Sequence, residues 1–170
     1  MSTPPRTRLE AQDVCVHFDG LKAIDQVDFS IEQNEIVGLI GPNGAGKTTL
    51  LNVLSGFQVP TTGKLRLGGD DATGRSPNWL ARRGVARTFQ SVRLFPTMTV
   101  FENVELGAIG VGASRAEARK VADRALDALG MTHRADLPAR SLPHGEERLA
   151  GVARALAVDP QFLLLDEPGA

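Results

Sequence analysis

Cysteine is almost absent from this sequence, because Cys15 is the only one in 170 residues. A single thiol excludes an internal disulfide and any cysteine-rich metal site. Cys15 lies between Val14 and Val16, in a stretch that alternates apolar and polar residues up to Phe18. We therefore expect a thiol that is buried in a strand rather than a reactive one.

Long apolar runs and a strong net charge are also missing. The longest unbroken apolar runs, such as Phe162–Leu165, are far too short to span a bilayer. The start, MSTPPRTRLE, has no apolar core, so we expect no signal peptide and a cytoplasmic chain, unless a partner carries it to a membrane. The net charge of −1 gives no support to a nucleic-acid partner attracted by bulk charge.

The chain also lacks internal repeats, low-complexity tracts and sustained heptads. Hydrophobic residues make up 42% and charged residues 23%, which is ordinary for a globular protein, and the length suits one domain. We expect a polar tail at residues 1–8 and a domain at residues 9–170.

Alternation of apolar and polar residues predicts several strands. Residues 14–18 and 27–31 each place an apolar side chain at every second position, which is typical of half-buried strands. Residues 64–67 alternate in the same way before a Gly-Gly turn. Glu35–Ile40 is almost continuously apolar, which predicts a parallel strand buried on both faces, and Phe162–Leu165 predicts a final buried strand.

Capping signals mark the helices between these strands. Residues 47–55 carry their apolar side chains on one helical face, and Ser76-Pro77 offers an N-cap and a first-turn proline. Two capping boxes, Thr99–Glu102 and Ser114–Glu117, begin two further helices, of which the second ends at Gly130. The order predicts an α/β core with an antiparallel annex and a helical insertion.

Residues 41–48, GPNGAGKT, match the phosphate-binding loop pattern G-x-x-x-x-G-K-[ST]. The glycines let the backbone curl so that its N–H groups point at phosphate oxygens, and the following helix adds its positive end. Lys47 is expected to reach the β- and γ-phosphates, and the Thr48 hydroxyl to ligate Mg²⁺. A chance glycine-rich turn is the alternative, but the motif lies between an apolar strand and a helix, as it requires. The expected nucleotide-binding residues are Gly41, Pro42, Asn43, Gly44, Ala45, Gly46, Lys47, Thr48 and Thr49.

A second element, LLLDE at residues 163–167, ends an apolar run with two carboxylates. This places both charges at the carboxyl end of a buried strand, where α/β sheets bind ligands. Asp166 suits Mg²⁺, through water, and Glu167 suits a base or orienter of an attacking water. Such a run is often merely structural, and its pairing with a phosphate loop is what predicts a catalytic site.

With these motifs in place, the chain resembles the ATP-binding cassette of ABC transporters over about residues 9–170. GPNGAGKTT is similar to Walker A, LLLDEP to Walker B, Gln90 to the Q-loop glutamine and residues 142–146 to the signature loop. The segments RTFQSVRLFPTMTVFENV and LPHGE most resemble the ATPases of branched-chain amino acid importers. The resemblance implies a P-loop NTPase with a mainly parallel core sheet, an antiparallel β-subdomain and a helical subdomain at about residues 91–157.

The resemblance also implies roles for single residues. Gln90 and Glu167 would be catalytic, and Mg²⁺ would be held by Thr48, Gln90 and Asp166. Phe18 resembles the aromatic residue that stacks on adenine, although an apolar strand residue can equally be core.

In this family the signature loop serves the ATP of a second subunit, because two cassettes stack head to tail. The loop here departs from the common LSGGQ, and Leu149 stands where an arginine is common. Gly145 would still let backbone N–H groups at a helix start approach the γ-phosphate. The alternative is that residues 141–151 are only a loop and a helix start. The residues expected to contact nucleotide, mainly through their backbone, are Leu142, Pro143, His144, Gly145 and Glu146.

Family members continue beyond Walker B through a D-loop, a switch histidine and further strands and helices. His17, His133 and His144 all come too early to be that histidine. We therefore expect the sequence to be the N-terminal part of a longer cassette, with little ATPase activity of its own.

Together these features predict the ATPase subunit of an ABC importer for branched-chain or related amino acids, with ATP and Mg²⁺ as cofactors. Its partners would be a second ABC ATPase subunit, membrane permease subunits at the inner face of the plasma membrane and, indirectly, a solute-binding protein. Leu94, Phe95 and Met98 are the expected permease contacts, unless they are core residues.

Two other functions stay open. A soluble ABC-type ATPase acting on nucleic acid or ribosomes would need a coiled-coil insertion, zinc cysteines or a basic patch, and none is visible. A nucleotide-binding fragment without turnover is the second alternative. A GTPase is disfavoured because the base-reading motif N-K-x-D does not occur.

Overall fold

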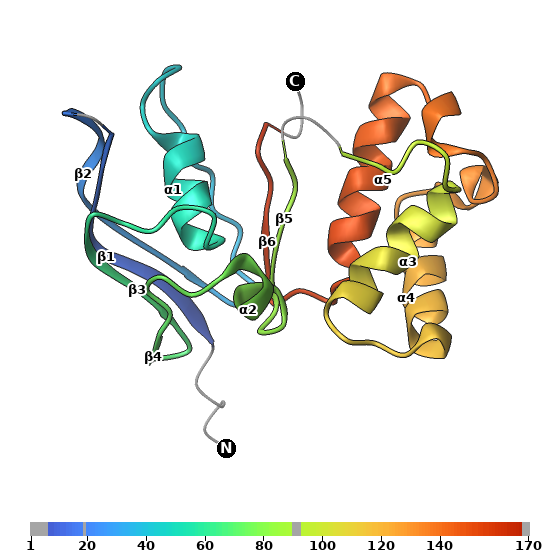
Figure 1. The fold of residues 1–170 in the computed structure, drawn as a ribbon, viewed down its shortest axis with the longest axis horizontal. Helices are drawn as coiled ribbons and strands as arrows, with labels where there is room; N and C mark the ends of the chain where they lie inside the picture. Colours follow the sequence, from blue (N-terminus) through green and yellow to red (C-terminus); the bar gives the residue numbers. More distant parts are fainter. Residues whose placement is uncertain (1–6, 19, 90–92, 168–170) are drawn as a thin grey trace. The chain divides into compact units, whose positions relative to one another are not determined.

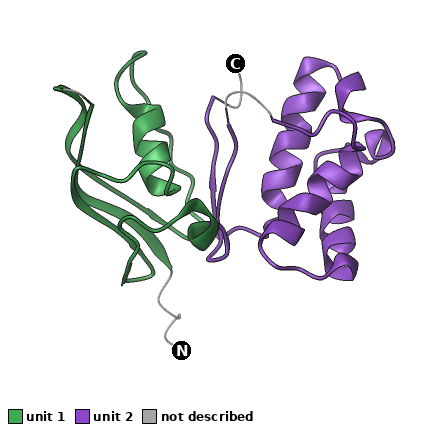
Figure 2. Cartoon of the chain, in the orientation of Figure 1, with its two compact units in different colours: residues 1–80 green, residues 81–170 purple. Residues whose placement is uncertain are grey.

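The computed structural model of the chain describes residues 7–18, 20–89 and 93–167. The chain divides into two compact units, residues 1–80 and residues 81–170 (Figure 2). Within the described residues, no helix combines the length and the apolar character that crossing a membrane requires.

The first unit contains a four-stranded antiparallel sheet with the strand order β2-β1-β3-β4 (Figure 1). Its strands are β1 (Arg8–Phe18), β2 (Leu21–Glu32), β3 (Thr62–Leu67) and β4 (Asp70–Asp71). In β2 the half-buried Val27, Phe29 and Ile31 alternate with exposed residues, as predicted. The sequence pattern therefore identified this antiparallel sheet correctly.

Strand β1 departs from simple alternation where it crosses β3. Val14, Cys15 and Val16 are all buried, and the pairing with β2 shifts its register between Ala11 and Val14. A Cβ on Gly63 of β3 would lie 2.3 Å from the carbonyl oxygen of Asp13, so only glycine fits there. The thiol of Cys15 is buried in a strand, as expected.

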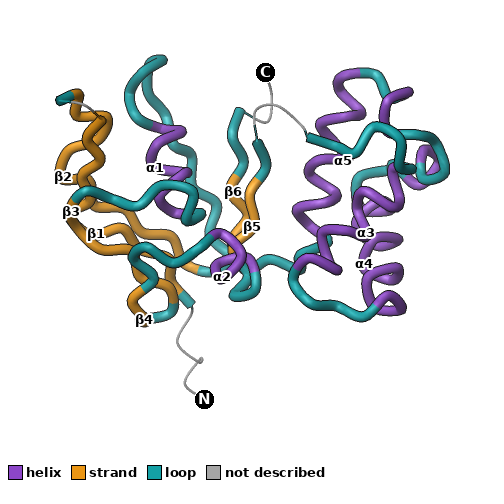
Figure 3. Tube along the Cα trace, viewed as in Figure 1, coloured by secondary structure: helices purple, strands orange, loops and turns teal. Residues whose placement is uncertain are grey.

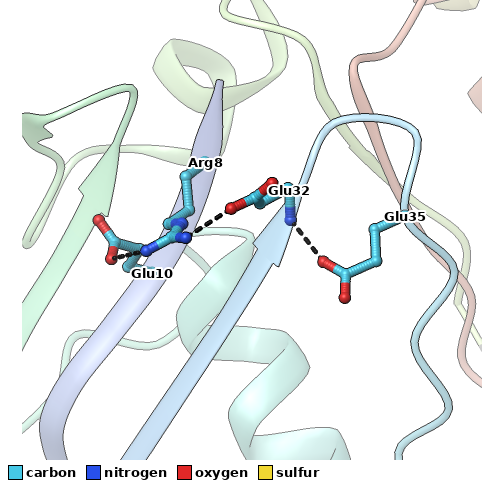
Figure 4. A network of polar contacts seen from close by, with 4 residues as sticks. All are labelled: Arg8, Glu10, Glu32 and Glu35. Carbon is cyan, nitrogen blue, oxygen red and sulfur yellow. Dashed lines mark hydrogen bonds and ion pairs between the residues drawn. The ribbon is translucent and has the colours of Figure 1, made fainter. Parts of the chain in front are cut away.

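Ionic contacts tie together the open end of the β1–β2 hairpin (Figure 4). Arg8 pairs with Glu10 and Glu32, and the backbone N–H of Glu32 donates to Glu35 Oε2 at 2.8 Å. The hydrogen bond to Glu32, followed by the charge of Glu32, raises the pKa of Arg8 further above its usual value. Because these groups are exposed, the network orients the strand ends more than it stabilises them.

Helix α1 (Lys47–Leu54) packs Leu50, Val53 and Leu54 into the first unit, which confirms the predicted apolar face. It ends before Gly56, whose φ of 76° lies in the left-handed region. A Cβ on Gly56 would lie 2.7 Å from both the carbonyl oxygen of Arg75 and Leu80 Cδ1. A glycine is therefore required at this helix end.

The strand predicted at Glu35–Ile40 is not present. This segment has no regular secondary structure and is drawn as a loop in Figure 3. Ile36 and Ile40 are 100% and 94% exposed, and none of the described strands pairs with the segment. An apolar run becomes a parallel strand only where a neighbour completes its hydrogen bonds, so the prediction was wrong for lack of that partner.

The second unit contains a parallel pair, β5 (Val85–Arg87) and β6 (Phe162–Leu164). Short helix α2 (Pro77–Ala81) precedes it, and the Ser76 hydroxyl accepts from the Trp79 N–H at 3.3 Å as its N-terminal cap. The Gly84 carbonyl accepts from the N–H groups of residues 161 and 162, at 2.8 and 2.9 Å. The final buried strand predicted at residues 162–165 is thereby confirmed for residues 162–164, whereas Leu165 lies outside it and is exposed.

Helices α3 (Val100–Gly110), α4 (Arg115–Ala128) and α5 (His144–Leu156) complete this unit, with 3₁₀ turns at Thr132–Arg134 and Ala139–Ser141. Both predicted capping boxes are present, at the starts of α3 and α4. A Cβ on Gly107 of α3 would lie 2.3 Å from the carbonyl oxygen of Arg154, so α3 and α5 approach closely. The core between the three helices uses small side chains, which allow such close packing: Ala108, Ala118, Ala122, Ala125, Ala150, Ala153 and Ala157.

Candidate functional site

The phosphate-loop motif lies in the first unit and leads directly into α1. The Ala45 N–H donates to the Pro42 carbonyl at 3.2 Å, which closes a turn, and Gly44 has a φ of 82°. The Lys47 ammonium group donates to the carbonyl oxygens of Gly41 and Pro42, at 2.7 and 2.9 Å. The loop therefore curls around the lysine that was expected to bind phosphate.

Gly46 fixes how this loop enters α1. It is the N-cap of the helix, with a φ of 84°, and the Leu50 N–H donates to its carbonyl at 2.8 Å. A Cβ at this position would lie 2.5 Å from Ile24 Cγ2 and 2.6 Å from the carbonyl oxygen of Ala23. Any other residue would be strained by both its backbone and its neighbours, so β2 and the loop constrain each other.

The remaining residues of the motif lie at the surface of the first unit. Gly41, Pro42, Asn43, Gly44, Ala45 and Thr48 are exposed, whereas Thr49 is half-buried. Phe18, at the end of β1, is 46% exposed, so it is not a core residue of this unit. A ring with this exposure has a face available for a ligand.

Asp166 lies just after β6 and is only 8% exposed. Its carboxylate Oδ2 accepts from Arg87 Nη2 at 3.0 Å, and the two side chains are 7% and 4% exposed. Arg87 ends β5, and its guanidinium lies 5.1 Å from the centre of the Phe89 ring. The parallel pairing of β5 and β6 thus brings a buried cation to the carboxylate that was expected to act on Mg²⁺.

Glu167 follows with an exposed side chain and a φ of 48°. A glutamate in the left-handed region is uncommon, and such strain occurs often at functional sites. Asp166 and Glu167 border a small cavity of about 40 Å³ within the second unit. Its other charged lining residues are Arg87, Arg93, Arg148 and Arg154.

One of these arginines is partly desolvated by its surroundings. Burial lowers the pKa of Arg154, and its Nη1 donates to the carbonyl oxygen of Arg93 at 2.6 Å. The cavity therefore combines two acidic groups with several cations on one side of the second unit. Gln90, the expected catalytic and Mg²⁺-binding glutamine, lies outside the described residues.

The expected signature loop forms the start of α5. Pro143 is its N-cap without a side-chain cap bond, and Pro143, His144 and Gly145 are exposed. A Cβ built on Gly145 would meet nothing within 4 Å, so this turn faces open space. The first backbone N–H groups of a helix have no partner inside the helix, so the turn can donate to an anion.

The other two residues of the loop are held by the second unit itself. Leu142 packs against the alanine-rich core between α3, α4 and α5. Glu146 forms an ion pair with Arg134, with Oε1 accepting from Nη2 at 2.9 Å and Nε 2.8 Å from Oε2. These contacts hold Leu142 and Glu146 against the second unit. The residues between them, Pro143, His144 and Gly145, are exposed and can be reached by a ligand.

The expected permease-contacting loop divides into two parts. Leu94 packs against the helical core, whereas Phe95 is 54% exposed. The backbone of Phe95 is held by the fully buried Asn103, whose Oδ1 accepts from its N–H at 2.7 Å and whose Nδ2 donates to its carbonyl at 3.1 Å. The structure thus presents the Phe95 ring outward on a fixed backbone, with Met98 half-buried.

Comparison with known proteins identifies the family of this chain. The family described as ABC transporter matches residues 24–170. The high-affinity branched-chain amino acid transport ATP-binding protein BraF of Pseudomonas aeruginosa is 38% identical over 180 residues, which cover 97% of this chain and 71% of BraF. This chain belongs to the ABC transporter family. LivG of Escherichia coli strain K12, which carries the same description, is 38% identical to this chain. The match covers 95% of this chain and 69% of LivG.

Solved structures agree with this assignment. The ATP-binding cassette MJ1267 of an ABC transporter matches with a TM-score of 0.85 and 32% identity, over 95% of this chain and 69% of that chain. The dimeric cassette MJ0796 matches with a TM-score of 0.84 and 28% identity, over 94% and 74%. The predicted fold class, a P-loop NTPase with antiparallel, parallel and helical parts, is confirmed. Cassettes of this family hydrolyse ATP and work as dimers with membrane permease subunits, and this chain is an ABC-type ATPase.

Three residues of the cassette were missed by the sequence reasoning. Arg87 pairs with Asp166 from 79 positions away, Arg134 pairs with Glu146, and Asn103 holds the Phe95 backbone. The sequence signal for Arg87 is a charged residue at the end of a short apolar strand. A charge that is buried at such a position needs a partner of opposite charge. Arg134 and Asn103 carry no comparable local signal, because their partners are reached only after the helices pack.

Proposed function

We propose that this chain is the ATP-hydrolysing subunit of an ABC importer for branched-chain or related amino acids. The observation that carries the proposal is the phosphate loop, in which Gly46 caps α1 and the Lys47 ammonium group donates to two carbonyl oxygens of the loop. The substrate class is supported by the descriptions of BraF and LivG, which resemble the chain along nearly its whole length.

The loop residues Gly41 to Thr49 would bind the phosphates of ATP, with Lys47 donating to the β- and γ-phosphates. By the chemistry of their side chains, Thr48, Gln90 and Asp166 would hold Mg²⁺, because oxygen atoms are the ligands that this metal prefers. When bound, Mg²⁺ neutralises phosphate charge during phosphoryl transfer. Glu167 would orient the attacking water and accept its proton, and Phe18 would stack on adenine.

Assembly completes the proposed site. In a head-to-tail dimer, His144 and Gly145 at the exposed start of α5 would donate backbone N–H groups to the γ-phosphate on a second subunit. Phe95 would contact permease subunits at the inner face of the plasma membrane, and a solute-binding protein would act through those permeases. No role in this proposal requires nucleic acid.

Two substitutions test the nucleotide chemistry. Lys47→Ala should remove most ATP affinity, because no other ammonium group is held in the loop. Glu167→Gln should keep ATP affinity and stop phosphate release. Lys64→Ala, at an exposed lysine of β3, is the matched control and should change neither quantity. ATP affinity is measured by calorimetry, and turnover by phosphate release in the assembled transporter. Hydrolysis at the parent rate by the glutamine variant would exclude Glu167 as the catalytic carboxylate.

The substrate class needs a separate test in the organism that makes the protein. Deletion of the gene should reduce uptake of labelled leucine, isoleucine and valine. Uptake of ferric iron is the control, because two Fe(3+) ions import ATP-binding proteins FbpC are 39% and 43% identical over 92% of this chain. Normal uptake of all three amino acids in the deletion strain would exclude the branched-chain assignment and leave the ATPase assignment standing.

A further inference from the structure

Three side chains that commonly bind metals meet on the β1–β2 hairpin of the first unit. Cys15 and His17 come from β1, two positions apart, and Asp25 comes from β2. Their potential ligand atoms, one sulfur, one ring nitrogen and one carboxylate oxygen, all lie within 4.8 Å of one another. No residue of this cluster belongs to the nucleotide-binding motifs.

The Cys15 sulfur is buried and accepts a backbone hydrogen bond. Cys15 is 6% exposed, and the backbone N–H of Gln26 donates to its Sγ at 3.2 Å. Gln26 has a φ of 49°, an uncommon conformation that aims this N–H at the sulfur. A hydrogen bond from outside the ligand set stabilises the negative charge of a thiolate and holds it in place, as outer contacts do at known metal centres.

The two oxygens of Asp25 have different neighbours. Oδ2 accepts from Lys22 Nζ at 2.8 Å, and Oδ1 accepts from the Cys15 thiol at 3.6 Å. The carboxylate thus accepts from the ammonium group through one oxygen and from the thiol through the other. A metal that replaces the thiol proton would face Oδ1 beside the sulfur, while Lys22 holds the carboxylate from the other side. Asp25 and His17 are exposed, which gives a metal access from solvent.

We propose that Cys15, His17 and Asp25 form a binding site for zinc. A thiolate, an imidazole and a carboxylate are all ligands of Zn²⁺, and three protein ligands leave a fourth tetrahedral position for water. The sulfur ligand distinguishes the site from the one proposed for Mg²⁺, which prefers oxygen ligands only. Because the ligands come from two paired strands, zinc would cross-link β1 and β2 and stabilise the first unit on binding.

Cobalt tests the site directly, because Co²⁺ bound by a thiolate shows a charge-transfer absorption band that oxygen ligation does not give. The intact, reduced chain is titrated with Co²⁺ without nucleotide or Mg²⁺, and Zn²⁺ is then added in competition. We expect one equivalent of Co²⁺ to produce the band and one equivalent of Zn²⁺ to abolish it. Zinc should also raise the melting temperature of the parent chain.

Variants separate a built site from a lone reactive thiol. Cys15→Ser should lose the band, and His17→Gln and Asp25→Asn should each weaken Zn²⁺ binding by about tenfold or more. His133→Gln is the matched control, since His133 is exposed in the second unit and its ring lies 3.1 Å from the Gly130 carbonyl oxygen. Because His17 is a surface residue, its variant should fold normally.

Lys22→Gln distinguishes a metal site from a purely structural cluster, because only a metal site predicts a change in Zn²⁺ affinity. Glutamine keeps a donor for Asp25 Oδ2 but removes a positive charge beside the metal, so Zn²⁺ affinity should rise severalfold. Parent-like affinity in both His17→Gln and Asp25→Asn would overturn the proposal, because the metal would then be held by the thiol alone. Absence of the cobalt band in the parent chain would overturn it as well.

Discussion

Replacing Arg87 by methionine tests the buried ion pair that holds Asp166. Methionine is also long and unbranched, so it fills much of the space of the arginine but carries no charge. The carboxylate of Asp166, with its side chain 7% exposed, would then be buried without the guanidinium that now lies 3.0 Å from it. Removing one partner of a buried pair is far more destructive than removing both.

The expected loss of folding stability is about 3–5 kcal/mol, the range for breaking a buried ion pair by removing one partner. For a protein of this size such a loss lowers the melting temperature by about 10 °C. The double variant Arg87→Met, Asp166→Asn should recover most of the loss, because it removes both charges of the buried pair. The two substitutions should therefore be coupled by roughly 2 kcal/mol or more.

Urea denaturation followed by far-ultraviolet circular dichroism measures these differences, since helices α3 to α5 of the second unit dominate that signal. The parent, both single variants and the double variant form a complete cycle. The reasoning is refuted if Arg87→Met stays within about 1 kcal/mol of the parent, the range of an exposed pair. Strict additivity of the two single changes would refute it too.

Two further substitutions test the second unit. Gly107→Ala should destabilise it by about 1–3 kcal/mol, because the added Cβ would lie 2.3 Å from the Arg154 carbonyl oxygen; Gly110→Ala, where a Cβ meets nothing within 4 Å, is the control in the same melts. Gly145→Asp should fold normally and bind ATP like the parent, yet lose turnover in the assembled dimer, because its carboxylate would repel the γ-phosphate of the partner subunit. Equal loss of ATP binding by the isolated chain would show that the loop serves its own nucleotide.

Local signals in the sequence predicted local structure well. The capping boxes that begin α3 and α4 need only residues within one turn of each other, and both are formed. The alternating strands of the antiparallel sheet were recognised for a similar reason, since each pattern reports burial of one face. The burial of Cys15 was expected from its apolar neighbours Val14 and Val16, and all three residues are buried.

Features that depend on distant residues were predicted poorly. Residues 35–40 have the composition of a buried strand, but composition does not supply the neighbouring strand that such a segment requires. The pair of Arg87 with Asp166 joins residues 79 positions apart, and only the register of β5 against β6 brings them together. The cluster of Cys15, His17 and Asp25 was missed because its members come from two strands, and only the pairing of β1 with β2 brings Asp25 beside Cys15.

The pairing of β5 with β6 also determines how freely the length of the helical segment between them can vary. The two strands are neighbours, although α3, α4 and α5 separate them in the chain. The two ends of the segment between β5 and β6 are held together. Arg87 lies opposite Leu164, and the Thr88 N–H donates to the Leu164 carbonyl at 3.0 Å. A segment anchored in this way can vary in length at little entropic cost. The helices between the strands can therefore accept insertions and deletions while the carboxylates after β6 keep their place.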